Sequence, residues 1–124
     1  MRRACGLLIL LLALVTVLPL AAQTATPTPG CPDLLPTRLI LHERGRVSRS
    51  DPDPVNVRAE PGTSGGLIGQ LPAGIVFYVL EGPSCTQRYT WYRVKAVVEG
   101  AGLSGWIAEG DASTYFIERF PPGL

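Results

Sequence analysis

The sequence predicts an all-β fold, either a small closed barrel or a pair of packed sheets, built from five to seven short and mostly antiparallel strands. Three observations lead to this prediction. Apolar segments are short and are separated by turn residues at close intervals. The 14 glycines and 12 prolines suit many tight turns and few helices. After the N-terminal region, no run of residues has a convincing helical period of apolar positions.

The first residues are predicted to be a leader that is not part of the fold. Arg2 and Arg3 precede the uncharged apolar run Gly6–Leu20, and two alanines follow it. This order is typical of a secretory signal peptide, so we expect removal of residues 1–22 and a secreted or extracytoplasmic protein. The alternative is a leader retained as a transmembrane anchor, because the apolar run nearly spans a bilayer.

A linker and one domain are predicted to follow the leader. Residues 23–36 begin with QTATPTPG, a Thr/Pro-rich composition that is extended, hydrated and unable to build a core. The folded domain is expected over residues 37–120, and residues 121–124 are a tail.

Seven segments are predicted as strands or as containing one. In order along the chain they are RLILHE (38–43), VNVRA (55–59), LIGQL (67–71), PAGIVFYVLEGP (72–83), YTWYRVKAVVEG (89–100), LSGWIAEG (103–110) and YFIER (115–119). Residues 45–54 are expected to form a polar loop. The segment 72–83 has apolar residues on both faces, which predicts a central position in the sheet. The expected core includes Leu39, Val57, Leu67, Ile68, Leu71, Val79, Val94, Trp106 and Ile107.

The charge of the chain argues against polyanionic partners in general. Removal of the leader takes away two of the 11 basic residues and none of the 10 acidic residues, which leaves a net charge of −1. This mixed-sign composition gives no electrostatic case for a nucleic acid or an anionic membrane. After signal cleavage, no membrane association is expected.

Two cysteines, Cys31 and Cys85, remain after the leader. In a compartment that permits disulfides, the simplest interpretation is one bridge that ties the N-terminal segment to a loop of the domain. Two free thiols are the alternative. The chain has no Cys-x-x-Cys motif and no Cys/His cluster, so we predict neither a metal site nor a cofactor.

The residues that catalysis would need are not brought together by any motif. The single histidine, His42, falls in a predicted strand, whereas nucleophilic catalysis needs a base within hydrogen-bond reach of a nucleophile. Two carboxylate pairs, Asp51 with Asp53 and Glu109 with Asp111, fall in predicted loops, where short acidic residues usually form turns and stay solvated. We therefore predict a protein that is not an enzyme, and a small hydrolase is the weakest alternative.

Four motifs occur in a fixed order: NVRAEPG at 56–62, IGQLPAG at 68–74, WYRV at 91–94 and GWIAEG at 105–110. Together they resemble a bacterial SH3-like domain (SH3b), over roughly residues 46–120. The resemblance implies a small, mostly antiparallel β-barrel that binds a ligand without catalysis. It implies cell-wall peptidoglycan or another extracellular ligand as the partner. The alternative is a protein-interaction or structural module that recognises an extended or Pro-rich peptide.

A binding surface is expected to use aromatic side chains, because flat rings stack at little entropic cost. The candidate ligand-binding residues are Tyr89, Trp91, Tyr92, Arg58 and Tyr78, and Trp106 and Tyr115 are further aromatic candidates. Strand alternation sends Trp91 and Arg93 to the face opposite Tyr92, unless a bulge resets the register. Trp91 is equally compatible with the core and with the surface, Trp106 fits the core better, and Tyr89 is expected to be exposed.

Asn56 and Arg58 precede the Pro61-Gly62 break, and a structural role is the favoured interpretation for both. Asparagine tolerates the left-handed backbone conformation of turns, and its side chain can form a hydrogen bond to the backbone of its own turn. The stem of Arg58 is expected to lie on the barrel while its guanidinium pairs with a nearby carboxylate.

Overall fold

The computed structural model describes residues 12–16 and 30–122. The predicted leader and the residues 23–29 of the linker therefore lie largely outside the described part, and residues 12–16 have no regular secondary structure. In residues 12–16 and 30–122, no helix is long and apolar enough to cross a membrane.

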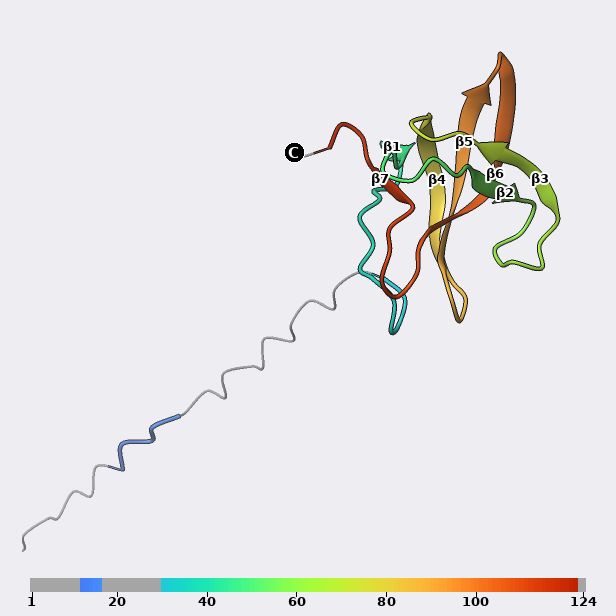
Figure 1. Ribbon diagram of the computed structural model, residues 1–124. Helices are drawn as coiled ribbons and strands as arrows, with labels where there is room; N and C mark the ends of the chain where they lie inside the picture. Colours follow the sequence, from blue (N-terminus) through green and yellow to red (C-terminus); the bar gives the residue numbers. More distant parts are fainter. Residues whose placement is uncertain (1–11, 17–29, 123–124) are drawn as a thin grey trace, which may run out of the picture.

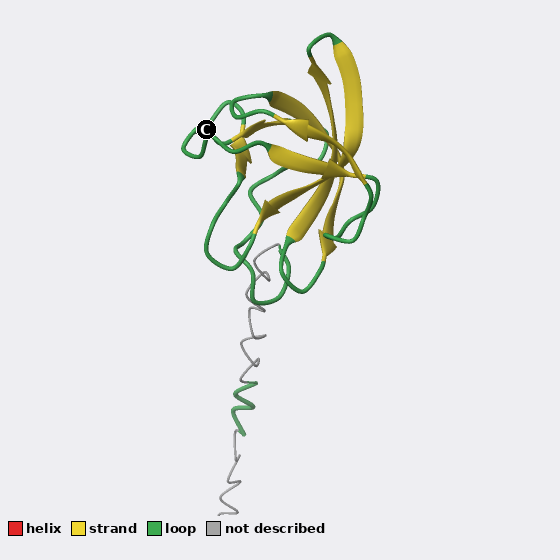
Figure 2. Cartoon of the chain, turned by 45° about the vertical axis from the view of Figure 1, so that its right-hand side comes forward, coloured by secondary structure: helices red, strands yellow, loops and turns green. Residues whose placement is uncertain are grey.

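Seven antiparallel strands form one sheet that curls into a half-barrel (Figures 1 and 2). The strands are β1 (Arg44–Val47), β2 (Val55–Arg58), β3 (Leu67–Leu71), β4 (Val76–Cys85), β5 (Thr90–Val98), β6 (Ala101–Gly110) and β7 (Ile117–Arg119). Their order in the sheet is β3-β2-β6-β5-β4-β1-β7. The all-β prediction and the predicted number of strands are confirmed.

The β5–β6 hairpin is the longest paired element of the sheet, with a register that runs from Thr90↔Gly110 to Val98↔Ala101. Its two turn residues, Glu99 and Gly100, have φ values of 50° and 79°. Positive φ at both positions defines a type I′ turn, whose twist matches the right-handed twist of the flanking strands. Figure 1 shows the tip of this hairpin extending past the other strands.

Inward-facing residues of the strands form a single core. Of the predicted core residues, Leu39, Val57, Leu71, Val79, Val94 and Ile107 are buried. The prediction is wrong for Leu67 and Ile68, which are 57% and 48% exposed. Both residues lie on β3, at the end of the strand order, where one side of the strand has no neighbour. Trp106 is only half-buried, because strand alternation gives the core position to its neighbour Ile107.

The segment 38–43 does not form the strand that its apolar residues predict. His42 has a φ of 65° in a turn, and the first strand covers Arg44–Val47, so that three of its four residues lie in the segment 45–54 predicted as a loop. Instead of joining a ladder, the backbone N–H groups of Arg38 and Leu39 donate to the carboxylate of Glu109. A long-range side-chain contact therefore overrides the local strand propensity.

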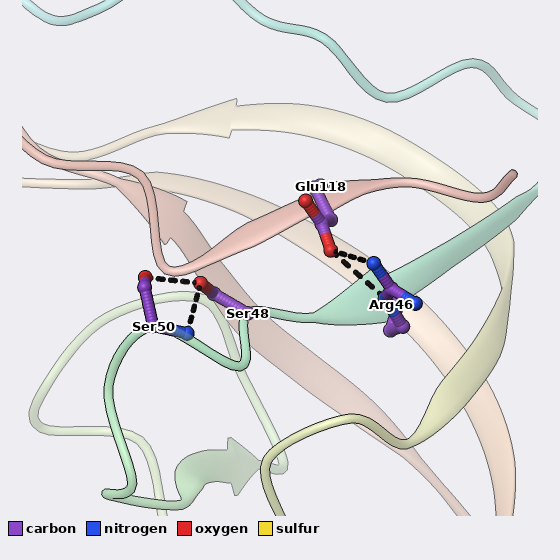
Figure 3. Close-up of polar contacts among 4 residues, drawn as sticks. All are labelled: Arg46, Ser48, Ser50 and Glu118. Atoms are coloured by element: carbon purple, nitrogen blue, oxygen red, sulfur yellow. Dashed lines mark hydrogen bonds and ion pairs between the residues drawn. The ribbon is translucent and has the colours of Figure 1, made fainter. Parts of the chain in front are cut away.

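The β1–β7 pair is fixed by side chains as well as by its backbone ladder. The Arg46 Nε atom donates to Glu118 Oε1 at 2.8 Å across the two strands (Figure 3). On the inner face, a Cβ at Gly45 would lie 2.6 Å from the ring of Phe77, so glycine lets β1 lie against this buried ring.

Candidate binding cleft

The predicted disulfide is confirmed: Cys31 and Cys85 are bonded, with their Cα atoms 5.4 Å apart. The bond ties the segment before the first strand to the end of β4. The Leu35 N–H donates to the Asp111 carbonyl at 3.0 Å, so residues 31–36 lie against the sheet beside the β6–β7 connection.

A cleft of about 300 Å³ opens next to this attachment. Its walls come from the β1–β2 loop, the β2–β3 loop, the β4–β5 turn and the β6–β7 connection, and its floor comes from β2, β5 and β6. The lining residues are Ser48, Ser50, Asp51, Asp53, Pro54, Val55, Asn56, Arg58, Thr63, Tyr89, Trp91, Ala108, Thr114, Tyr115 and Phe116.

Three aromatic rings form one side of the cleft. The ring centroids of Tyr89 and Trp91 are 5.8 Å apart in an edge-to-face arrangement, and those of Tyr89 and Phe116 are 6.0 Å apart. The Trp91 Nε1–H donates to the hydroxyl of Thr86 at 2.9 Å. Such rings give apolar contact area with few rotatable bonds, which suits binding.

The sequence leaves open whether Trp91 belongs to the core or to the binding surface, and the structure shows features of both. The register shifts between Thr90 and Trp91, and Trp91 stands opposite Ala108 on the cleft side of the sheet. The side chain is nevertheless only 3% exposed. Trp91 is thus a buried residue that still lines the cleft. Tyr89, expected to be exposed, is half-buried beside it.

Arg58 and Asn56 line the cleft and also hold the structure around it. The Arg58 Nη1 donates to the Gly65 carbonyl at 2.8 Å, which ties the β2–β3 loop to β2. The expected carboxylate partner of Arg58 is replaced by this backbone carbonyl. Asn56 lies in β2 and accepts a hydrogen bond from Gln70 Nε2 at 2.9 Å, across the β2–β3 pair and not within a turn.

Short polar side chains shape the two loops that face each other across the cleft. In the β1–β2 loop, the hydroxyls of Ser48 and Ser50 lie 2.7 Å apart (Figure 3), and Asp51 Oδ1 accepts the Asp53 N–H. In the β6–β7 connection, Asp111 Oδ1 accepts the N–H groups of residues 113 and 114 at 2.8 and 2.7 Å. The hydrogen bond from the backbone N–H of Ser113 is the main cause of a lowered pKa of Asp111.

Glu109 departs from the expectation for its carboxylate pair, because it lies in β6 and is 1% exposed. Its Oε2 atom accepts hydrogen bonds from the Thr37 hydroxyl and from the N–H groups of Arg38 and Leu39, at 3.0–3.1 Å. Thr37 also bonds to the hydroxyl of Tyr92. We call Thr37, Tyr92 and Glu109 the polar clamp, because they fasten the N-terminal segment to the sheet.

Burial raises the pKa of the Tyr92 hydroxyl in the polar clamp. Loss of hydration disfavours the phenolate and is the largest cause of a raised pKa of Tyr92. The hydrogen bond with Thr37 opposes this shift, and the negative charge of Glu109 adds to it.

The cleft brings together three of the five predicted site residues: Tyr89, Trp91 and Arg58. It does not include Tyr92, which belongs to the polar clamp, or Tyr78, which lies on the outer face of β4. Phe116 was not a candidate in the sequence. The preceding residue, Tyr115, was a candidate, and its hydroxyl donates to the Pro36 carbonyl at 2.6 Å. An aromatic pair directly after the Asp111 turn is the only sequence signal that could have indicated this wall.

Comparison with known families agrees with this geometry. Residues 53–113 match the family model of the bacterial SH3 domain, a range that runs from the end of the β1–β2 loop into the β6–β7 connection. No curated protein and no solved structure gives a significant match.

Proposed function

The chain belongs, through residues 53–113, to the bacterial SH3 domain family, and we propose that it is an exported binding module that holds a cell-wall ligand in its cleft. Domains of this family are generally binding modules and not catalysts, and we propose the same for this chain. The ligand that we propose is peptidoglycan, bound through its peptide portion.

The observation that carries the proposal is the aromatic cleft. Its volume of about 300 Å³ lies at the lower end of the usual range for sites that hold small molecules. Tyr89, Trp91 and Phe116 give it an apolar side. The carboxylates of Asp51 and Asp53 line the facing loop, where an amino group of a peptide could form charge-assisted hydrogen bonds.

The disulfide supports export. Bridges such as Cys31–Cys85 form and persist in oxidising compartments and are rare in the cytosol. Together with the apolar leader in the sequence, the bond favours an extracytoplasmic location for the folded domain.

The test is co-sedimentation of the oxidised chain with purified peptidoglycan, for the wild type and for Tyr89→Ala. Tyr89 is half-buried at the cleft, so its truncation removes ring contact while the core remains intact. We expect retention of the wild type and a loss of affinity of about tenfold for Tyr89→Ala. Val97→Ala is the matched control, because Val97 is 67% exposed near the tip of the β5–β6 hairpin.

Absence of wild-type retention, or equal loss in both variants, would contradict peptidoglycan as the ligand. An extended Pro-rich peptide is the second candidate, because an aromatic-lined groove is the surface that such peptides recognise. Binding of a Pro-rich peptide that is sensitive to Tyr89→Ala, without retention on peptidoglycan, would favour this candidate.

A further inference from the structure

The outer face of the sheet places an aromatic ring between two cations. Phe77 and Val79 of β4 are buried in the core, so Tyr78 points outward. Tyr78 stands opposite Arg44 of β1 and opposite Lys95 of β5. Residues directly opposite each other in antiparallel strands share a face, so the three side chains form one row. The Lys95 ammonium lies 5.1 Å from the centre of the Tyr78 ring.

A second row repeats this arrangement on the neighbouring strands. Trp106 of β6 stands opposite Arg93 of β5 and opposite Arg58 of β2. Arg93 and Lys95 are two residues apart on the same strand, so the rows lie about 7 Å from each other on one face. We call the six residues of both rows the outer strip: Arg44, Tyr78, Lys95, Arg93, Trp106 and Arg58.

Three cations of the outer strip, Arg44, Lys95 and Arg93, are available to an external anion, whereas Arg58 donates to the Gly65 carbonyl. In the described part of the chain, no carboxylate lies within ion-pair distance of Arg44 or Lys95. Arg93 pairs with Glu81 at 3.2 Å, but both side chains are exposed to solvent, which screens the attraction and makes the pair weak. A stronger anionic ligand can therefore replace Glu81.

The charge on this surface differs from that of the whole chain. After the predicted leader, acidic residues outnumber basic residues by one, yet the outer strip contains four cations, and Glu81, opposite Arg93, is the one carboxylate that pairs with any of them among the described residues. The carboxylates of Asp51 and Asp53 line the cleft instead. Segregation of this kind attracts and orients a partner with the complementary charge.

We propose that the outer strip binds an acidic polysaccharide. The cations would pair with the carboxylates of the polymer, and the half-exposed rings of Tyr78 and Trp106 would contact the apolar faces of its sugar rings. An acidic peptide would need only the cations. The regular placement of a ring between two cations in both rows favours a polymer whose anionic unit is itself a ring. The strip crosses five neighbouring strands, about 19 Å along the curved sheet, so several units can bind at once.

The experiment measures the affinity of the oxidised chain for oligogalacturonate, with fully methyl-esterified oligogalacturonate as the uncharged form of the same backbone. We expect binding of the acid form, weaker binding at higher salt, and at least tenfold weaker binding of the ester. The double variant Arg44→Gln/Lys95→Gln should lose about tenfold in affinity for the acid form. The control Arg49→Gln/Arg88→Gln removes the same charge from exposed positions outside the strip and should change affinity less than twofold.

Two further probes test the class of polymer. Tyr78→Leu keeps apolar bulk but removes the ring, and it should weaken oligogalacturonate binding about threefold without a change in the salt dependence. Equal losses in the two double variants would overturn the proposal, as would binding of polyglutamate or of phosphatidylglycerol vesicles as tight as that of oligogalacturonate. Arg58 belongs to both the outer strip and the cleft, but the test is independent of the cleft function, because oligogalacturonate contains no peptide and Arg44, Tyr78 and Lys95 do not line the cleft.

Discussion

Tyr89 and Tyr92 are three residues apart in the sequence, yet they belong to regions that use a tyrosine in opposite ways. In the polar clamp, Tyr92 is 2% exposed and its hydroxyl bonds to Thr37. In the cleft, Tyr89 is half-buried and contacts the rings of Trp91 and Phe116. No hydrogen bond of the Tyr89 hydroxyl occurs within the described residues. The polar groups of the clamp thus form hydrogen bonds within the chain, whereas the Tyr89 hydroxyl in the cleft is available to a ligand.

The two regions are joined through β6. Glu109, near the end of this strand, holds the N-terminal segment, and the chain then turns at Asp111 into the wall of the cleft. The comparison therefore predicts that changes in the clamp act on stability, while changes in the cleft act on binding.

The largest effect is expected from the covalent attachment beside the clamp. Cys31→Ser/Cys85→Ser removes a crosslink between residues 54 positions apart. The chain-entropy model gives a loss of about 4 kcal/mol in the free energy of unfolding, because the unfolded chain gains freedom. Urea unfolding of the oxidised wild type and the variant measures it. A loss below about 1 kcal/mol would show that the crosslink does not hold the N-terminal segment to the fold.

Removal of the clamp carboxylate should have the next largest effect. Glu109→Ala leaves the N–H groups of Arg38 and Leu39 without their acceptor and creates a buried void. We expect a loss of about 3 kcal/mol in the free energy of unfolding. Glu60→Ala, at an exposed position, should change it by no more than about 0.5 kcal/mol. Similar values for the two variants would remove the distinction between the clamp and the surface.

The smallest of these effects depends on pH. Tyr92→Phe removes one hydrogen bond and should cost about 1 kcal/mol at neutral pH. The pKa of Tyr92 is raised in the folded protein, so its stabilising effect is complete below the unfolded pKa of about 10 and is lost as the pH rises through that value toward the folded pKa. The stability difference between wild type and Tyr92→Phe should therefore shrink above pH 10, as measured by urea unfolding from pH 7 to pH 11. A constant difference would contradict a buried, neutral Tyr92.

Much of the fold could be predicted from local sequence because its signals are local. LIGQL at 67–71 matches β3 exactly, and the strands around the 99–100 turn follow from alternation and a Gly-containing turn. The segment 38–43 could not be predicted, because its conformation depends on Glu109, about 70 residues away. The exposure of Ile68 could not be predicted either, because the sequence does not reveal that β3 lies at the edge of the sheet.

The cleft was predictable only in part. Tyr89, Trp91 and Arg58 could be named because motifs and aromatic character mark them, but the sequence does not show that the Tyr92 hydroxyl bonds to Thr37, 55 residues away, and so belongs to the polar clamp. Phe116 reaches the cleft because the chain turns back at Asp111, and side-chain bonds within the loop determine this turn.

The central claim is that the cleft, and not the clamp, meets the ligand. Titration of the isotopically labelled chain with a soluble peptidoglycan fragment, followed by backbone amide chemical shifts, tests it most directly. The account predicts saturable shifts concentrated in residues 48–58, 86–91 and 111–116. An absence of shifts, or shifts confined to residues 37–39 and to β3, would contradict it.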